Sequence, residues 1–171
     1  MKTLAAWAVL FVTMVQGPAN ATSTLFRLAG ERGIVAVQAD PNQPVFLYGF
    51  TRDGVFRDTL ALSPGATFET GPVEVGAEVC VSLLIGMPWN LGNGATLEIA
   101  VETDGELLVT QHRLDPAHHR EDRTWRPVRI DLDPGTERAS MSLTMIPDLD
   151  GQIGDWLGIA PGSEAGCLFS D

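Results

Sequence analysis

The loop from Gly86 to Gly94 carries residue types that could bind a sugar. It reads Gly-Met-Pro-Trp-Asn-Leu-Gly-Asn-Gly, so the aromatic ring of Trp89 stands near two amides, Asn90 and Asn93. An aromatic face stacks on the C–H face of a sugar, and amides bond its hydroxyl groups. We therefore expect a ligand site at these three residues. The alternative is that Trp89 folds back to cap the core and that Asn93-Gly94 is only a turn.

Two further tryptophans, Trp125 and Trp156, stand where predicted strands begin or end. A tryptophan at such a place commonly closes the edge of a core. Trp156 could also add an aromatic face to a sugar site, so it stays with Trp89 as a candidate ligand residue. The two interpretations differ in whether the three rings group on the surface or are each buried.

The polar loop that follows Leu114 contains two adjacent histidines. His118 and His119 lie among Asp115, Glu121 and Asp122, a combination that could bind a metal or respond to pH. Adjacent residues of an extended chain point apart, however, and nothing in the spacing defines a coordination geometry. The favoured interpretation is an exposed polar loop.

An acidic segment near residue 150 invites a calcium interpretation. Asp148-Leu-Asp150-Gly matches the middle of an EF-hand loop, but the first position would be Ile146 and the bidentate glutamate position would be Leu157. The EF-hand is therefore excluded. A structural calcium of another kind, held by Asp148, Asp150 or Asp155 with backbone carbonyls, is the alternative to a plain acidic turn. No other cofactor is expected.

Signatures of catalysis are missing, since the sequence has no serine elbow, no HExxH and no phosphate-binding loop. This favours a protein that is not an enzyme. A glycosidase needs only two placed carboxylates, and the chain has 22 acidic residues from which they could come. A small polysaccharide-active enzyme therefore stays as an alternative.

The first 21 residues resemble a secretory signal peptide. Lys2 gives a short basic start, residues 4–15 are nearly all apolar, and Ala19-Asn20-Ala21 has the form of a cleavage site. The apolar run is too short for a comfortable membrane span, and no second run follows. We expect residues 22–171 to be one secreted or periplasmic domain with no membrane span.

The charge of the mature chain excludes one class of partner. Lys2 is the only lysine, so ten arginines remain against 22 acidic residues, for a net charge near −12. Such a surface should be repelled by nucleic acid and by anionic membranes. It suits solubility, cation binding or neutral ligands.

The two cysteines, Cys80 and Cys167, predict a disulfide. An even count in an oxidising compartment favours a bridge, and two thiols alone are poor zinc ligands. Closing a loop of roughly 90 residues would stabilise the fold by about 4–5 kcal/mol on the chain-entropy model. The bridge would fasten the C-terminal segment to a strand in the middle of the domain.

Short strands separated by turns run through the mature chain. Apolar and polar residues alternate with a period of two, which puts the apolar side chains on one face of a sheet. We find no convincing amphipathic helix. The expected fold is all-β, a two-sheet antiparallel β-sandwich of jelly-roll type. Strands are predicted at residues 25–28, 33–38, 45–51, 55–62, 79–85, 95–103, 106–113, 128–132 and 140–145.

The segment from Arg123 to Pro161 resembles a known family. It has Arg-x-Trp before an alternating strand that ends Ile-Asp-Leu, then a turn, a second strand and Gly-Asp-Trp-x-Gly-x-Ala-Pro. The Pro-Trp-Asn loop and Gly-Asn-Gly turn within Cys80–Thr103 complete the resemblance. These motifs resemble galactose-binding-like jelly rolls, the fold of many carbohydrate-binding modules of exported bacterial proteins. The resemblance concerns the architecture more than the site.

These observations predict an exported, non-catalytic recognition domain that binds a glycan or a component of the cell envelope through loops at one end of the sandwich. The first alternative is a structural or protein-interaction domain of the envelope with no sugar site. The second is the small polysaccharide-active enzyme named above.

Overall fold

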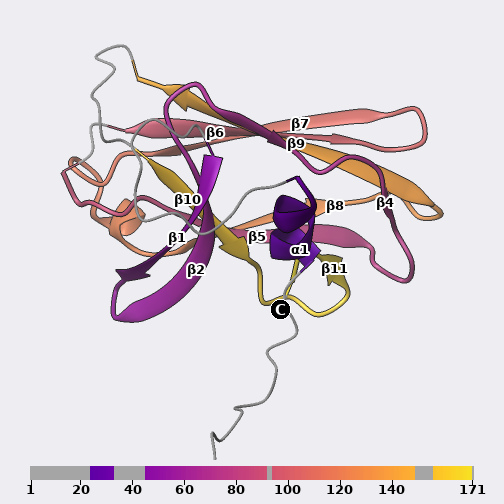
Figure 1. Cartoon of the computed structure of the whole chain (residues 1–171), viewed down its shortest axis with the longest axis horizontal. Coiled ribbons are helices and arrows are strands. Elements are labelled where there is room, and N and C mark those ends of the chain that lie inside the picture. The colour runs from indigo at the N-terminus through magenta and orange to yellow at the C-terminus, as the bar shows by residue number, and fades with distance from the viewer. Residues whose placement is uncertain (1–23, 33–44, 92–93, 149–155, 171) are drawn as a thin grey trace, which may run out of the picture.

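The structure, a computed structural model, describes residues 24–32, 45–91, 94–148 and 156–170. The predicted signal peptide and the strand predicted at 33–38 lie outside these residues. Two antiparallel sheets form the described part (Figure 1), so the predicted fold class is confirmed. The elements are α1 (Thr24–Glu31), β1 (Val45–Arg52), β2 (Val55–Leu62), β3 (Thr67–Glu69), β4 (Val73–Glu74), β5 (Cys80–Gly86), β6 (Ala95–Glu102), β7 (Leu107–Leu114), the 3₁₀ helix η1 (Arg120–Arg123), β8 (Arg126–Asp131), β9 (Arg138–Pro147), β10 (Leu157–Pro161) and β11 (Cys167–Leu168).

The first sheet is built around β5. Its strand order is β1-β2-β10-β5, and β8 and β11 also pair with β5, β11 in the parallel direction. All seven residues of β5 are buried. This burial agrees with the nearly continuous apolar sequence of the strand, which is typical of a central strand covered on both faces.

The second sheet has the order β3-β9-β6-β7, with β4 pairing beside β9. The strands predicted at residues 95–103 and 106–113 form a hairpin around Asp104-Gly105, in which β6 and β7 pair along their whole length. Gly105 has a φ of +121°, a conformation that glycine adopts without strain.

The main core lies between the two sheets and contains the alternating residues. From β6, Leu97, Ile99 and Val101 are fully buried. They pair in register with Met145, Leu143 and Met141 of β9, which are buried beside them in the same core. The period of two in the sequence therefore identified the buried face of both strands.

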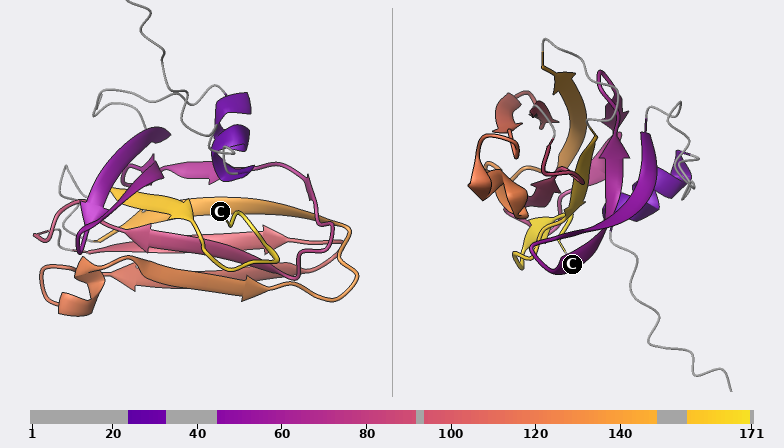
Figure 2. Two further views of the ribbon diagram at one scale, coloured as in Figure 1. Left: turned by 90° about the horizontal axis from the view of Figure 1, so that it is seen from below. Right: turned by 90° about the vertical axis from the view of Figure 1, so that its left-hand side faces the viewer.

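One strand prediction is wrong. Residues 25–28 belong to the helix α1, which lies on one side of the sandwich (Figure 2). Leu25, Leu28 and Ala29 have the spacing of one helical face, and all three are buried in the main core. No helix among the described residues is long and apolar enough to cross a membrane.

The predicted disulfide between Cys80 and Cys167 is confirmed, with the two Cα atoms 4.5 Å apart. The cysteines are also register partners, because β11 pairs with the start of β5. The bridge thus fastens the C-terminal segment to the central strand.

The β1–β2 hairpin bends away from its sheet. β1 and β2 pair from Val45 and Leu62 to the tip at Arg52 and Val55, whereas β2 pairs with β10 only at residues 60–62. Both views in Figure 2 show the hairpin leaving the plane of the other strands. Phe46 and Phe50 of this hairpin are buried, yet they stand outside the main core cluster. The bent hairpin therefore covers a second apolar cluster on the outer face of the first sheet.

Candidate functional site

The segments that hold the predicted site residues come together at one end of the sandwich, on the left in Figure 1. The β5–β6 and β7–β8 connections lie there, together with the start of β10 and the tip of the β1–β2 hairpin. Antiparallel strands place alternate connections at the same end of a sheet, and this brings segments far apart in the sequence to one surface.

Three aromatic rings contact one another in a row at this end, with planes inclined at 59° and 83°. We call them the aromatic shelf: Trp89, Trp156 and Tyr48. The ring centroids of Trp89 and Trp156 are 5.1 Å apart, and those of Trp156 and Tyr48 are 5.7 Å apart. Trp89 is 47% exposed, and the other two rings are half-buried. Trp89 therefore does not fold back into the core, and Trp156 stands beside it.

The aromatic shelf rests on buried rings of the hairpin. Phe46 lies edge-on to Trp156 at 4.8 Å, and Phe50 lies 6.3 Å from Tyr48. Phe46, Tyr48 and Phe50 alternate along β1, so one face of this strand supplies all three. The half-buried and buried rings beneath Trp89 hold the shelf in one position.

Trp125 closes the edge of this cluster. Its ring centroid is 4.8 Å from that of Phe50, and its Nε1 donates a hydrogen bond of 3.0 Å to the carbonyl of Val55 at the hairpin tip. The ring lies over Gly86, where a Cβ atom would stand 3.0 Å from Trp125 Cε3. This is the edge-plug role that the sequence suggested for it.

Asn90 stands next to the aromatic shelf and is fixed by an arginine. Arg52 Nη1 donates a hydrogen bond of 2.5 Å to Asn90 Oδ1. Arg52 Nη2 lies 3.5 Å from the backbone carbonyl of Asp122 in the β7–β8 connection. Burial lowers the pKa of Arg52, and the charge of Arg123 lowers it further. Arg52 thus joins the loop of Trp89 to the polar loop.

A polar cleft of about 520 Å³ opens beside Trp125. Its walls include charged groups of both signs, and several of them are paired with one another. Arg113 Nη2 lies 3.4 Å from Asp115 Oδ2, and Arg126 Nη1 lies 3.6 Å from Asp122 Oδ1. The lining residues include Arg113, Asp115, Asp122, Thr124, Trp125 and Arg126.

The two buried carboxylates of the cleft hold its loop together. Asp122 Oδ2 accepts a hydrogen bond from the backbone N–H of Asp115 at 2.7 Å. Asp115 Oδ1 accepts from the backbone N–H of His118 and lies 2.9 Å from His118 Nδ1. Burial raises the pKa of Asp115, but the hydrogen bonds from His118 and Arg113 outweigh it, so the pKa lies below its usual range. A carboxyl with a lowered pKa is a poor general acid.

The histidines occupy separate environments. His119 Nδ1 lies 3.5 Å from Glu121 Oε1, and His112 Nε2 lies 2.9 Å from Thr110 Oγ1. Burial lowers the pKa of His112, and so does the charge of Arg126. Among the described residues, the groups close enough to share a metal ion are Cys80, Glu164 and Cys167, whose two sulfurs form the disulfide.

Of the other predicted site residues, the structure describes one and leaves three outside its described ranges. Asn93, Asp150 and Asp155 lie outside the described residues. Asp148 is described, and both of its carboxylate oxygens accept hydrogen bonds from Arg113, at 2.9 and 2.7 Å. A calcium ion at Asp148 would have to compete with that guanidinium, and the calcium site stays a prediction.

The contribution of the hairpin to the site was not predicted from the sequence. Phe46, Tyr48, Phe50 and Arg52 follow one another at every second position of β1. This alternation was visible in Val-Phe-Leu-Tyr-Gly-Phe-Thr-Arg and indicates one strand face with three rings and a cation. It did not show that the hairpin bends towards Trp156 and Asn90.

No protein-family model matches the chain, and no curated protein matches it. Solved structures that are similar include the carbohydrate-binding module TmCBM61 in complex with β-1,4-galactotriose, at 15% identity and a TM-score of 0.41, over 72% of this chain and 74% of that one. Another is CsCBM6-3 from Clostridium stercorarium in complex with cellobiose, at 14% identity and a TM-score of 0.39, over 81% and 96%. The cupin domain of Drosophila melanogaster CENP-C matches at 12% identity and a TM-score of 0.28, over 66% and 71%. The likeness is one of general fold outline.

Proposed function

We propose that this chain is an exported, non-catalytic recognition domain that binds a glycan on the aromatic shelf. The observation that carries the proposal is the contact between Trp89 and Trp156, with ring centroids 5.1 Å apart and Trp89 47% exposed. Each ring has a flat apolar face on which the C–H face of a sugar can stack, and the planes of Trp89 and Trp156 are inclined at 59° to each other.

Polar groups around the aromatic shelf supply the second requirement of a sugar site. Asn90 borders the shelf, and the polar cleft with Thr124 and Arg126 opens beyond Trp125. Amide, hydroxyl and guanidinium groups bond sugar hydroxyls and fix the orientation of a ligand that stacking alone would leave free to slide. A ligand longer than one sugar could touch both the shelf and the cleft.

Rigidity favours binding as well. The shelf is supported by buried Phe46, and Asn90 is held by buried Arg52. A ligand therefore meets side chains that are already ordered, and less conformational entropy is lost on binding.

Export is supported by the N-terminal pattern and by the disulfide, which is typical of oxidising compartments. Expression of the full chain in a bacterial host, followed by fractionation and N-terminal sequencing, tests it. We expect a mature protein that begins at Thr22 in the periplasm or medium. An uncleaved protein in the cytoplasm would contradict export.

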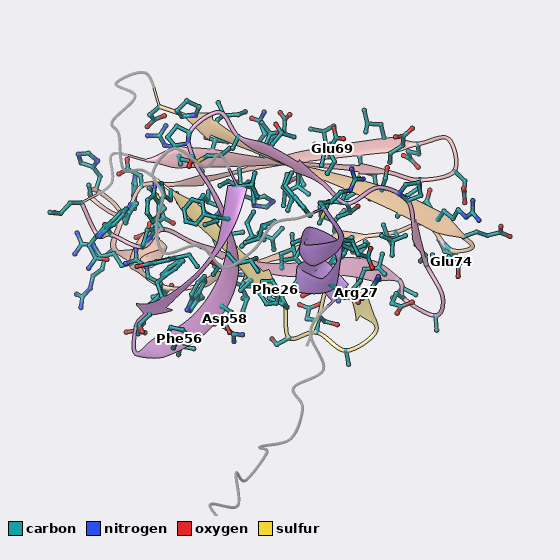
Figure 3. All side chains as sticks on the ribbon, viewed as in Figure 1. Phe26, Arg27, Phe56, Asp58, Glu69 and Glu74 are labelled. Carbon is teal, nitrogen blue, oxygen red and sulfur yellow. A yellow bond between two sulfur atoms is a disulfide. The ribbon has the colours of Figure 1, made fainter. Side chains whose placement is uncertain are left out.

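Glycan binding is tested with residues 22–171 on a glycan array. Trp89→Ala removes the exposed ring of the shelf. Phe56→Ala is the matched control, because Phe56 is an aromatic residue of the hairpin (Figure 3), is 61% exposed, and lies outside the ring contacts of the shelf. We expect Phe56→Ala to bind like the wild type, and Trp89→Ala to lose about tenfold or more in affinity.

Two results would overturn the proposal. If the wild-type chain binds no glycan, a structural or protein-interaction role in the envelope becomes the better account. If Trp89→Ala binds as well as the wild type, the shelf is not the site. Release of reducing sugar from a bound polysaccharide would point to the enzymatic alternative.

A further inference from the structure

The side chain of Asn90 can offer a ligand the hydrogen-bond donors of its amide nitrogen. A guanidinium group donates and never accepts, so the Asn90 atom that bonds Arg52 Nη1 at 2.5 Å must be the carbonyl oxygen, Oδ1. The amide nitrogen, with its two N–H groups, is then on the other side of the amide. Among the described residues no group accepts from this nitrogen, and Asn90 is exposed.

Behind Asn90 lies a buried positive charge, that of Arg52. Arg52 is only 4% exposed. In the described part of the chain no carboxylate lies within ion-pair distance of Arg52, and its buried Nε has no hydrogen-bond partner. With described residues, its two Nη atoms contact the neutral oxygens of Asn90 and of the Asp122 backbone. A buried charge in a folded protein is normally paired.

The neighbouring carboxylates are already engaged elsewhere. Asp122 bonds the backbone of Asp115 and faces Arg126, while Asp115 bonds His118 and Arg113. Arg123 adds a second positive charge near Arg52, and its own guanidinium donates to the backbone carbonyls of Pro116 and Ala117. Among the described residues, Arg52 and Arg123 thus leave a net positive charge behind Asn90, although the chain as a whole is acidic.

We propose that the Asn90 amide, backed by Arg52, binds the carboxylate of an acidic sugar, so that the ligand of the aromatic shelf contains a uronic acid. This inference rests on the proposed glycan binding. A carboxylate accepts an N–H group of the amide in a charge-assisted hydrogen bond and brings a negative charge towards Arg52, whereas a neutral hydroxyl accepts without bringing that charge. The acidic groups elsewhere on the chain repel such a ligand only weakly, because physiological salt screens charges that lie more than about 8 Å apart.

The test compares pairs of oligosaccharides that differ at C6 alone. Trimers of galacturonic, glucuronic and mannuronic acid are measured by titration calorimetry against the corresponding trimers of galactose, glucose and mannose. We expect the acidic member of at least one pair to bind about tenfold tighter or more, since charge-assisted hydrogen bonds are about twice as strong as neutral ones. Neutral trimers that bind as well as the acidic ones in every pair would overturn the inference while leaving glycan binding intact. No binding by any trimer or by the array would overturn the proposed function itself.

The variant N90D separates a recognition role from a structural one. Its carboxylate would pair with Arg52, which should keep or raise the melting temperature, yet it removes both outward donors and repels an acidic ligand. We expect the preference for acidic trimers to disappear in a protein that is at least as stable as the wild type. Retained preference in N90D would overturn the inference.

The variant R52M removes the charge and keeps much of the apolar stem. We expect the ratio of acidic to neutral affinity to fall towards one, while neutral trimers still bind through Trp89. If R52M fails to fold, N90D alone decides. An unchanged ratio in a folded R52M would show that Arg52 plays no part in recognition.

Discussion

The ring of Phe50 lies directly against Gly158. A Cβ atom at residue 158 would stand 2.3 Å from Phe50 Cε1 and 2.7 Å from its Cζ, closer than any real contact allows. Gly158 pairs in register with Gly86, over which Trp125 lies. These two neighbouring glycines form the floor on which the rings of the bent hairpin rest.

Replacing Gly158 by alanine should therefore push the hairpin out of position. We expect G158A to lower the free energy of unfolding by about 1–3 kcal/mol, as overpacking usually does, and to weaken glycan binding because the support of the aromatic shelf moves. Chemical denaturation measures the first effect. The control is G30A in α1, where a Cβ atom would meet nothing within 4 Å. That change should be neutral or stabilise the helix by up to about 1 kcal/mol. If G158A and G30A changed the free energy of unfolding equally, the close contact between Phe50 and Gly158 would not explain the loss.

Trp156 and Trp89 should differ in what they contribute to stability. Trp156 contacts Phe46, Tyr48 and Trp89, whereas Trp89 has Trp156 as its ring partner among the described residues. We expect W156A to cost about 3 kcal/mol, because its half-buried ring is packed against other rings, and W89A about 1 kcal/mol or less. Thermal melting of both variants under one condition checks the order. A larger loss of stability in W89A than in W156A would mean that the exposed ring of Trp89 stabilises the fold more than the ring of Trp156, contrary to this prediction.

Removing the disulfide should destabilise the whole fold. Cys80 and Cys167 are separated by 87 positions, and a loop of that length corresponds to about 4–5 kcal/mol on the chain-entropy model. Urea unfolding of the C80A/C167A double variant, beside the wild type with and without reductant, measures the loss. Titration of the denatured wild type should find no free thiol before reduction. Two reactive thiols would contradict the bridge.

The charge of Asp115 should make stability depend on pH in the acidic range. The pKa of this carboxyl is lowered in the folded chain, because the hydrogen bonds of His118 and Arg113 outweigh the effect of burial. A lowered folded pKa contributes stability above the unfolded value, about pH 3.9, and this contribution is lost as the pH falls through the folded pKa. We expect D115N to be less stable than the wild type at pH 7.

The difference between D115N and the wild type should shrink below about pH 4. Unfolding free energies measured from pH 7 down to pH 2.5 give this difference directly. A gap that stays constant over that range would assign the loss to the changed hydrogen bonds rather than to the charge.

The fold class was predictable because the strands carry their pattern locally. Leu97, Ile99 and Val101 alternate with polar residues, and Asp104-Gly105 is a hairpin signal that needs no knowledge of the rest of the chain. The helix α1 was not recognised. The apolar run at residues 25–28 covers little more than one helical turn, which is too short to show a helical period. The strands β3, β4 and β11 have two or three residues each, too few to show a period.

Only part of the candidate site could be predicted from the sequence. Trp89 and Asn90 were identified from residue type on a long loop, and Trp156 was kept beside them. Their partners could not be found, since Arg52 is separated from Asn90 by 38 positions and meets it through the bend of the hairpin. That bend depends on Gly86 and Gly158 lying side by side, which is a property of the strand register and not of either local sequence.

β2 pairs with β1 along its whole length but with β10 only at residues 60–62, and this difference has a dynamic consequence. Towards its tip the hairpin is no longer bonded to β10, and it is held instead by ring contacts and by the bond from Trp125 to Val55. Such a segment can open as a cooperative unit at a lower free energy than global unfolding. In amide hydrogen exchange, the outer half of β1 and β2 should lose protection together and earlier than β5 or β6. A ligand that bridges Trp89 and Tyr48 would slow that exchange, so the hairpin would report occupancy of the shelf without any label on the ligand.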